Sequence, residues 1–479
     1  MSAIIEAVRG MRDLLPAEQR GMAQVRAQIE TLFFHHGYSP IELPILEQRD
    51  LYQRKLGEDL AGKLYEFNFG GRDLVMRPEW TASVLRTYVA HLQDQPLPLR
   101  FCYSGPVFRY ERPQRHTYRQ FTQAGVELVG GPGPRADAEV VALACAGLDR
   151  LGVQPYRVVL GHIGLVRELL SHLAITERAR NILIWGLERI RTKGIAPVYA
   201  RLAQHEENLP IDPALLEGLD DARAEALLLR LLQTMQINLG FGSRPPEAII
   251  ERLLRKVRRD DPLPRVERAL SLLEQLGQIR GTPSEALPQA AALLGEVGMN
   301  PAALEDMRAI LALLAAHGVN EQRIVLDFGL GRGLNYYTGL IFEIYDAHDM
   351  QICGGGRYDD LVTALGGRVA VPAVGFAYGL ERVIAAMAHP LPPEPSREVL
   401  VVAVTDADYP YALRVAQQLR EAGYVASLDL RGRSLTSNLR DATRRAIGYA
   451  AIVGAEERAQ GEAVLRNLVT REEQRIRVN

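Results

Sequence analysis

The sequence predicts an α+β protein in which one mixed core domain is split by a helical insertion and followed by a smaller α/β domain. Three observations support this prediction. Residues 1–165 and 321–390 share strand and glycine patterns, residues 166–320 carry apolar side chains at three- and four-residue spacing, and strands alternate with helices in 397–479. Two separate α/β domains on either side of a helical one are the alternative.

Helix and strand patterns alternate within residues 1–165. Apolar spacing predicts a helix over 16–34, and residues 38–46 are predicted as a strand interrupted by Pro40 and Pro44. Further strands are expected over 73–76, 99–110 and 123–129.

The second half of the chain returns to strands with IVLDFGLG, LIFEIYD and QICGGGRYDDL. The segment HPLPPEPS (389–396) is proline-rich and is expected to be a linker. After it, EVLVVAV, YVASLDL and YAAIVGA read as strands separated by helices, the first of them over 411–422. This alternation predicts a small domain with a largely parallel sheet.

The composition excludes several classes of protein. Lys+Arg 56 against Asp+Glu 58 give a net charge of −2, so any nucleic-acid site must be a local patch. Three scattered cysteines are too few for a disulfide framework or a thiolate metal site. Neither a signal-peptide layout nor an 18-residue apolar run is present, so we expect a cytoplasmic protein with reduced thiols and no membrane association.

An arginine-rich turn follows a strand in GPVFRYERPQRHTYRQF. Its guanidinium groups would repel one another unless an anion lies among them, and arginine suits phosphate because its planar fork binds two oxygens at once. A solvated hairpin loop explains the segment equally well. The charged residues around Pro113 are Arg109, Glu111, Arg112, Arg115 and Arg119.

The segment RPEWTASVLR has the pattern of a helix start. Pro78 and Thr81 suit the first turn, where the helix dipole favours the carboxylate of Glu79. Glu79 is also able to hold an ammonium group, although a plain helix start accounts for the pattern by itself.

Two glycine-rich segments follow the insertion. In GLGRGLNYYTGLIFE, glycines flank Arg332, and Tyr336 and Tyr337 precede a strand. Glycine permits close approach of a ligand, and an isolated arginine there can stabilise developing negative charge. In CGGGRYDDL, three glycines precede Tyr358. A glycine turn, a bulged loop and wall packing by Tyr358 are the plainer explanations.

The remaining candidates are single residues. In AVGFAYGLERV a strand turns into a helix that carries Arg382, which suits either a phosphate or a salt-bridged helix face. His162 lies in an apolar run and is expected to be a core histidine. HExxH, GxSxG and CxxC patterns are missing from the sequence, so zinc-protease, serine-hydrolase and thiol-redox functions lack support.

Together, and in this order, these segments resemble the histidyl-tRNA synthetase family of class II aminoacyl-tRNA synthetases. RPEWTA is similar to the family's histidine-site segment, FRYERPQ…YRQF to motif 2 and AVGFAYGLERV to motif 3. GRGLNYYTGLIFE and CGGGRYDDL resemble the two histidine-specific motifs. The resemblance implies an antiparallel sheet with flanking helices, ATP and Mg²⁺ as cofactors, no resident protein metal site, histidine and tRNA(His) as partners, and a homodimer.

The resemblance also implies roles for individual residues. Arg109 would hold the α-phosphate of ATP, Glu111 would lie near the adenine, and Arg382 would contact the γ-phosphate. Arg332, with Arg109, would be catalytic by stabilising charge between the histidine carboxylate and the α-phosphate.

Histidine itself would be read by a second group of side chains. Glu79 and Gln123 would bind the ammonium group, and Glu127 and Tyr337 the imidazole, with Tyr358 beside it. The expected histidine-binding set is Glu79, Thr81, Gln123, Glu127, Tyr336, Tyr337 and Tyr358.

Residues 397–479 resemble the family's anticodon-binding domain. Its arginines either make a local patch that faces phosphates or lie on a solvated helix face. These arginines are Arg431, Arg433, Arg440, Arg444 and Arg445.

Several departures keep other functions open. His116 and Thr117 stand where the family has Gly-Arg, so one ATP-facing guanidinium is expected to be absent, and Asn335 stands where Asp is usual. FTQAGVELVG and LGHIGLVRELL resemble the regulatory subunit of ATP phosphoribosyltransferase, a non-catalytic histidine sensor that would have the phosphoribosyltransferase catalytic subunit as its partner. A third hypothesis is a paralogue that adenylates another substrate. Arg332 and the C-terminal domain favour the ligase, because a pure regulator needs neither.

Overall fold

The computed structural model describes residues 5–53, 62–206, 215, 219–234, 263–331, 336–391 and 397–478. The chain forms two compact units, which we call the core unit (Met1–Leu391) and the C-terminal unit (Pro392–Asn479). The boundary between them in the sequence falls within the proline-rich segment predicted as a linker, of which residues 392–396 lie outside the described residues.

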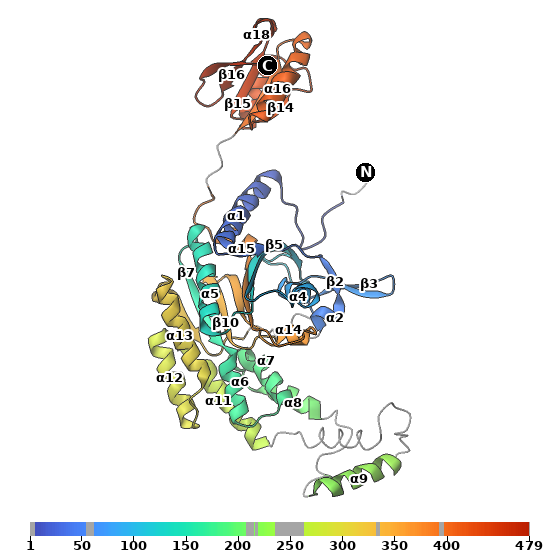
Figure 1. Cartoon of the computed structure of the whole chain (residues 1–479), viewed down its shortest axis with the longest axis vertical. Coiled ribbons are helices and arrows are strands. Elements are labelled where there is room, and N and C mark those ends of the chain that lie inside the picture. Colours follow the sequence, from blue (N-terminus) through green and yellow to red (C-terminus); the bar gives the residue numbers. More distant parts are fainter. Residues whose placement is uncertain are drawn as a thin grey trace. The chain divides into compact units, whose positions relative to one another are not determined.

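A nine-stranded sheet forms the centre of the core unit, in the order β1-β5-β6-β12-β11-β10-β7-β9-β8. Only the β1–β5 and β7–β9 pairs are parallel, so the described sheet is mainly antiparallel, as predicted. Strands from both sides of the helical segment lie next to one another, with β10 to β12 (orange) beside the blue and teal strands in Figure 1. The bounds are β1 Ser39–Pro40, β5 Leu99–Phe108, β6 Gln120–Val129, β7 Tyr156–His162, β8 Arg280–Gly281, β9 Ile324–Asp327, β10 Leu340–Asp346, β11 Gln351–Arg357 and β12 Ala373–Gly379.

The strand predicted over 38–46 is shorter and divided. Only β1 joins the large sheet, and the chain then moves to a second sheet through β2 (Leu46–Gln48). Pro40 and Pro44 lack the N–H that a continuous ladder needs, which explains the break. The second sheet has the order β2-β4-β3, with β3 at Tyr65–Phe69 and β4 at Arg72–Met76.

Helices cover the large sheet. α1 and α5 pack on β6, and their apolar faces bury residues at three- and four-residue spacing, such as Met22, Val25, Ile29 and Phe33 in α1. The helices that follow β7 continue this packing, with α13 against α5 and α11 against α7. The bounds are α1 Pro16–His35, α2 Arg49–Gln53, α4 Thr81–Thr87, α5 Gly133–Arg150, α6 Ile163–His172, α7 Glu177–Lys193, α8 Ala196–Glu206, α9 Asp221–Thr234, α11 Leu263–Gln278, α12 Pro283–Glu296, α13 Ala302–Ala316, α14 Leu361–Ala364 and α15 Leu380–Ala386, with a π-helix η1 at Tyr88–Leu92 and a 3-10 turn η4 at Glu321–Arg323.

The C-terminal unit contains a five-stranded sheet in the order β14-β13-β15-β16-β17. β14, β13 and β15 are parallel, whereas β16 and β17 are antiparallel, so the largely parallel sheet that was predicted holds for three of its strands. Among the described residues, no helix combines the length and apolar character needed to cross a membrane. The bounds are β13 Glu398–Ala403, η5 Asp406–Asp408, α16 Tyr409–Glu421, β14 Val425–Leu428, α17 Leu435–Arg444, β15 Tyr449–Val453, α18 Ala455–Gln460, β16 Glu462–Asn467 and β17 Glu473–Arg477.

Candidate functional site

The two faces of the large sheet differ in a way that creates a pocket. On one face, Val126, Phe376 and Tyr378 belong to the buried core beneath the helices. On the other face, the neighbouring positions Glu127, Gly375 and Gly356 lie in register across β6, β12 and β11. Small residues in the middle of a sheet leave room above it, so this face forms the floor of a site.

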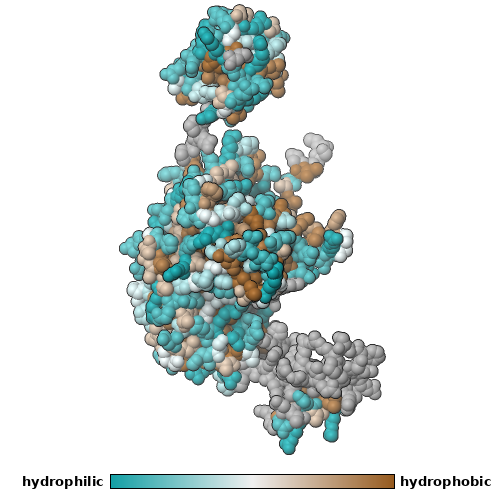
Figure 2. All heavy atoms as spheres, in the orientation of Figure 1, coloured by the Kyte–Doolittle hydropathy of each residue, from teal (hydrophilic) through white to brown (hydrophobic). Residues whose placement is uncertain are grey.

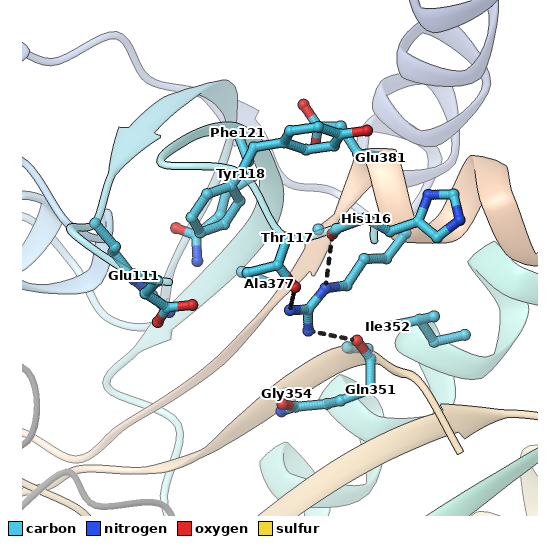
Figure 3. A pocket seen from close by; sticks show the side chains of 15 residues that line it. Glu111, His116, Thr117, Tyr118, Phe121, Gln351, Ile352, Gly354, Ala377 and Glu381 are labelled. Carbon is cyan, nitrogen blue, oxygen red and sulfur yellow. Dashed lines mark hydrogen bonds between the residues drawn. The ribbon is translucent and has the colours of Figure 1, made fainter. Parts of the chain in front are cut away.

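The pocket lies on the same face of the sheet, over Gln123, Ala377 and Gly354, between the loop that joins β5 to β6 and the start of α15 (Figure 3). It brings together four residues that were predicted to bind substrates, Arg109, Glu111, Gln123 and Arg382. The other lining residues are His116, Thr117, Tyr118, Phe121, Gln351, Ile352, Cys353, Gly354, Ala377, Gly379 and Glu381.

Arg382 enters the pocket from α15 and is held in place by uncharged acceptors. Its Nε donates to the His116 carbonyl at 3.3 Å, its Nη2 to the Thr117 hydroxyl at 3.1 Å, and its Nη1 to the Gln351 carbonyl at 3.0 Å (Figure 3). These bonds orient the guanidinium without neutralising its charge. An oriented, half-buried cation of this kind suits an anionic ligand.

Arg109 directly follows β5 and also lines the pocket. Its Nε donates to the Pro78 carbonyl at 2.8 Å, and its guanidinium lies 5.3 Å from the centre of the Phe121 ring. Glu111 lies two residues further on and forms an ion pair with Lys63 at 3.2 Å.

Two buried carboxylates lie deeper in the core unit. Glu127 on β6 accepts the Thr81 hydroxyl at 2.7 Å and the Tyr103 hydroxyl at 2.9 Å, both at Oε1. Glu79 accepts the Ala82 N–H at 3.1 Å, which fixes it at the start of α4. Burial raises the pKa of Glu79 and raises the pKa of Glu127 to about 8, the latter also because Glu79 is close.

Three polar atoms near these carboxylates are buried and have no hydrogen-bond partner among the described residues. They are Gln123 Oε1, Glu127 Oε2 and the Tyr358 hydroxyl. A Cβ built on Gly375 would lie 1.9 Å from Glu127 Oε2 and 2.6 Å from the Tyr358 hydroxyl, so these two groups share one space that glycine leaves open. Buried polar groups normally have partners, so this set indicates a polar ligand.

Aromatic rings enclose the same space. The ring centre of Tyr336 lies 4.7 Å from that of Tyr337 and 5.7 Å from that of Tyr358, and all three side chains are buried. Tyr336 and Tyr337 precede β10 and Tyr358 follows β11, so adjacent antiparallel strands bring the two glycine-rich segments together.

The sequence models of two families match this chain: histidyl-tRNA synthetase over residues 10–238 and 250–383, and the anticodon binding domain over 398–479. The chain belongs to the histidyl-tRNA synthetase family. Its curated relatives include the histidine–tRNA ligases of Methanocaldococcus jannaschii, 31% identical over 100% of this chain and 99% of the relative, and of Archaeoglobus fulgidus, 32% identical over 98% and 96%.

Solved structures agree with the family fold. Apo histidyl-tRNA synthetase from S. aureus superposes with a TM-score of 0.66 at 24% identity, over 99% of this chain and 97% of that one. A Bacillus halodurans protein described as an ATP phosphoribosyltransferase regulatory subunit/histidyl-tRNA synthetase has the same TM-score at 23% identity, over 95% and 100%. The predicted class II core is therefore confirmed.

Four further residues bear on the predictions made from the sequence: His162, Tyr103, Arg332 and Asn335. His162 is a core histidine as expected: it caps α6 by accepting the Leu165 N–H at 3.3 Å, and burial lowers its pKa to about 4. Tyr103, which bonds Glu127, was not predicted, and the sole signal was a tyrosine within an apolar strand. Arg332 and Asn335 lie outside the described residues, so the catalytic role of Arg332 stays a prediction.

Proposed function

We propose that this protein activates histidine with ATP to form histidyl-adenylate and then transfers the histidyl group to tRNA(His). The observation that carries the proposal is a set of buried atoms on Gln123, Glu127 and Tyr358 that have no partner in the described part of the chain, next to a pocket that contains Arg109 and Arg382. A polar amino acid would satisfy the buried atoms, and a triphosphate would match the arginines. The name of the curated relatives, histidine–tRNA ligase, supports the same conclusion.

Histidine would occupy the enclosed part of the site. Its imidazole would contact Glu127 Oε2 and the Tyr358 hydroxyl, with Tyr337 and Tyr336 as the aromatic wall. Thr81 would keep Glu127 in orientation through its 2.7 Å bond. The ammonium group would lie between Gln123 and Glu79, in reach of the pocket that Gln123 also lines.

ATP, arriving with Mg²⁺ bound to its phosphates, would occupy the arginine-lined part. A histidine carboxylate oxygen forms a bond to the α-phosphorus, the bond from that phosphorus to the bridging oxygen breaks, and pyrophosphate leaves. Arg109 and the predicted Arg332 would stabilise the charge at the α-phosphate, Arg382 would hold the γ-phosphate, and Glu111 would lie near the adenine. A terminal tRNA hydroxyl then attacks the activated carbonyl and releases AMP.

The tRNA would also contact the C-terminal unit, whose family model is an anticodon binding domain. Arg433 is committed to internal pairs with Asp429 and Asp441, each at 3.0 Å. Arg431 and Arg440 are exposed and are the better phosphate contacts in the predicted patch.

We propose that residues 166–320 are an insertion in the core domain.

A homodimer in the cytoplasm is the assembly that we propose. The small sheet and the residue directly before β2 expose four large apolar side chains. Hydrophobic surface is visible on the β2–β3 side of the core unit in Figure 2. An exposed cluster of this kind suits a second protein surface. Light scattering should then give a mass near twice 53.2 kDa. The side chains and their exposed fractions are Ile45 39%, Leu46 47%, Phe67 41% and Phe69 75%.

The decisive experiment is histidine-dependent exchange of pyrophosphate into ATP, followed by charging of tRNA(His). Exchange and charging by the purified protein are expected. Well-folded protein that binds histidine without exchange would instead support the histidine-sensing regulatory subunit. Arg332→Ala should abolish exchange and keep histidine binding, which separates the proposed catalytic role from binding.

A further inference from the structure

Arg357 is a buried arginine of β11 that the proposed reaction does not use. It pairs across the sheet with Val374, a position on the helix-covered face, so its side chain lies on the opposite side of the sheet from the pocket. It therefore cannot contact the substrates directly. Its next neighbour in sequence is Tyr358, whose hydroxyl is one of the unpartnered buried atoms.

The Arg357 guanidinium is held by a dense set of acceptors. Its Nε lies 2.8 Å and its Nη2 2.7 Å from Oδ1 of Asp137 on α5, and its Nη1 lies 3.0 Å from Oδ1 of Asp359. Nη2 also donates to the Gly131 and Gly133 carbonyls at 3.1 and 3.2 Å. Both charged side chains of the Arg357–Asp137 pair are almost fully buried, with 7% and 4% of their surface exposed.

Hydrogen bonds around Arg357 connect the segment that carries Tyr337 to the segment that carries Tyr358. Thr338, next to Tyr337, donates its N–H to the Arg357 carbonyl at 2.8 Å, and its hydroxyl accepts the Asp359 N–H at 3.0 Å. Asp359 in turn accepts the Ala373 N–H at 3.0 Å, and Ala373 accepts the Tyr358 N–H at 2.8 Å. The start of β10, the end of β11 and the start of β12 are thus fixed together at one point.

We propose that Arg357, anchored by Asp137, is a positioning residue that sets the separation of Tyr337 and Tyr358 and thereby the affinity for histidine. This inference rests on the proposed function. A buried ion pair is a poor way to gain stability, because desolvation of both charges offsets their attraction. The Arg357–Asp137 pair lies next to the segments that carry Tyr337 and Tyr358, so a role in positioning these tyrosines explains the pair better than a contribution to stability. Gly339 agrees with this, since a Cβ there would lie 2.9 Å from the Arg357 Cδ and would displace the chain.

The test uses two neutralising changes on the same helix. Asp137→Asn removes the anchor of Arg357, whereas Glu139→Gln removes the partner of Arg100, which bonds it at 3.0 Å away from the tyrosines. We expect Asp137→Asn to raise the dissociation constant of histidine, measured by calorimetry, about tenfold, because small displacements of binding groups are costly. The KM for ATP should stay within about twofold, and Glu139→Gln should change neither quantity.

A second pair of variants avoids the buried charges and the risk of misfolding. Thr338→Val removes the hydroxyl that joins the segments, and Thr338→Ser keeps it, so the valine variant alone should weaken histidine binding. Thermal unfolding is recorded for every variant. If Asp137→Asn and Thr338→Val lower stability but leave histidine binding unchanged, Arg357 is structural and the inference is wrong. Because histidine binding is measured without turnover, a protein that lacks exchange activity would contradict the proposed function and still test this inference.

Discussion

The part of the site proposed for histidine is enclosed by buried side chains, whereas the part proposed for the triphosphate is lined by half-buried arginines. In the first, Glu127 and Tyr358 are 0% and 2% exposed and have unpartnered polar atoms among the described residues. In the second, Arg382 is oriented by uncharged acceptors and keeps its charge. Buried unpaired groups reject a ligand that cannot bond them, while accessible cations attract any suitable anion. We therefore expect the enclosed part to supply selectivity and the arginine-lined part to supply charge.

The largest effect is expected from Arg109→Ala. It removes a cation from the point where negative charge is proposed to develop, so the rate of histidine-dependent exchange should fall about 10³-fold. Histidine affinity, measured by calorimetry, should fall much less than the exchange rate, because the change reaches the histidine part through the Pro78 carbonyl next to Glu79 and leaves Glu127 and Tyr358 in place. Arg112→Ala, a change in the same loop outside the lining of the pocket, is the control. An equal loss of histidine affinity in Arg109→Ala would mean that the two parts are not separable.

Glu127→Gln should have the next largest effect. Above pH 8, where Glu127 is ionised, the amide keeps an oxygen for Thr81 and Tyr103 but replaces the charged acceptor that is proposed to face the imidazole. Hydrogen bonds to charged groups contribute about 1.5–3 kcal/mol, so histidine affinity should fall about 10²-fold. ATP binding should be unaffected in a direct titration. Retained histidine affinity would show that Glu127 does not read the imidazole.

The same substitution should stabilise the ligand-free protein at alkaline pH. Burial raises the pKa of folded Glu127 to about 8 from an ordinary 4.5, so the folded chain holds a proton that the unfolded chain releases between these values. Wild-type stability is therefore lost as the pH rises from about 4.5 through 8. Glutamine does not titrate, so the unfolding temperature of Glu127→Gln should exceed that of wild type by about 4 °C at pH 9 and match it near pH 5. A constant difference at every pH would contradict the raised pKa.

Local patterns were sufficient for much of the fold. The helix predicted over 16–34 is α1, Pro16–His35, and the strand over 99–110 is β5, Leu99–Phe108, because apolar periodicity is a local property. The strand over 38–46 was too long, since its prolines divide it between two sheets. The antiparallel β16 and β17 were not foreseen, because alternation with helices ends after α18.

The residue types of the candidate site were easier to predict than its contacts. Glycine-rich segments marked Tyr337 and Tyr358 in the sequence, and a strand that turns into a helix marked Arg382. The bonds that hold them connect distant positions: 265 residues separate Thr117 from Arg382, and 220 separate Asp137 from Arg357. Such pairs follow from the sheet register, which no local pattern contains.

The smallest predicted effect concerns Thr117, which stands where the family has arginine. Its hydroxyl accepts a hydrogen bond from Arg382 Nη2 at 3.1 Å. Thr117 therefore orients the Arg382 guanidinium, whereas an arginine at this position would add a second cation. Thr117→Val removes this one bond, worth about 0.5–1.5 kcal/mol, and should raise the KM for ATP about fivefold. Thr117→Ser keeps the hydroxyl and should behave like wild type, and the histidine KM should stay constant in both.

Thr117→Arg adds a positive charge to the same pocket, whereas Thr117→Val removes a hydrogen bond. A second guanidinium beside Arg382 would be repelled in the empty site and attracted when a triphosphate is bound. The substitution should therefore lower the KM for ATP a few-fold and make it more sensitive to salt, because charge then contributes more than orientation. If Thr117→Val and Thr117→Arg both leave the KM for ATP unchanged, the triphosphate does not reach Arg382, and that residue belongs to the wall of the pocket instead of its binding surface.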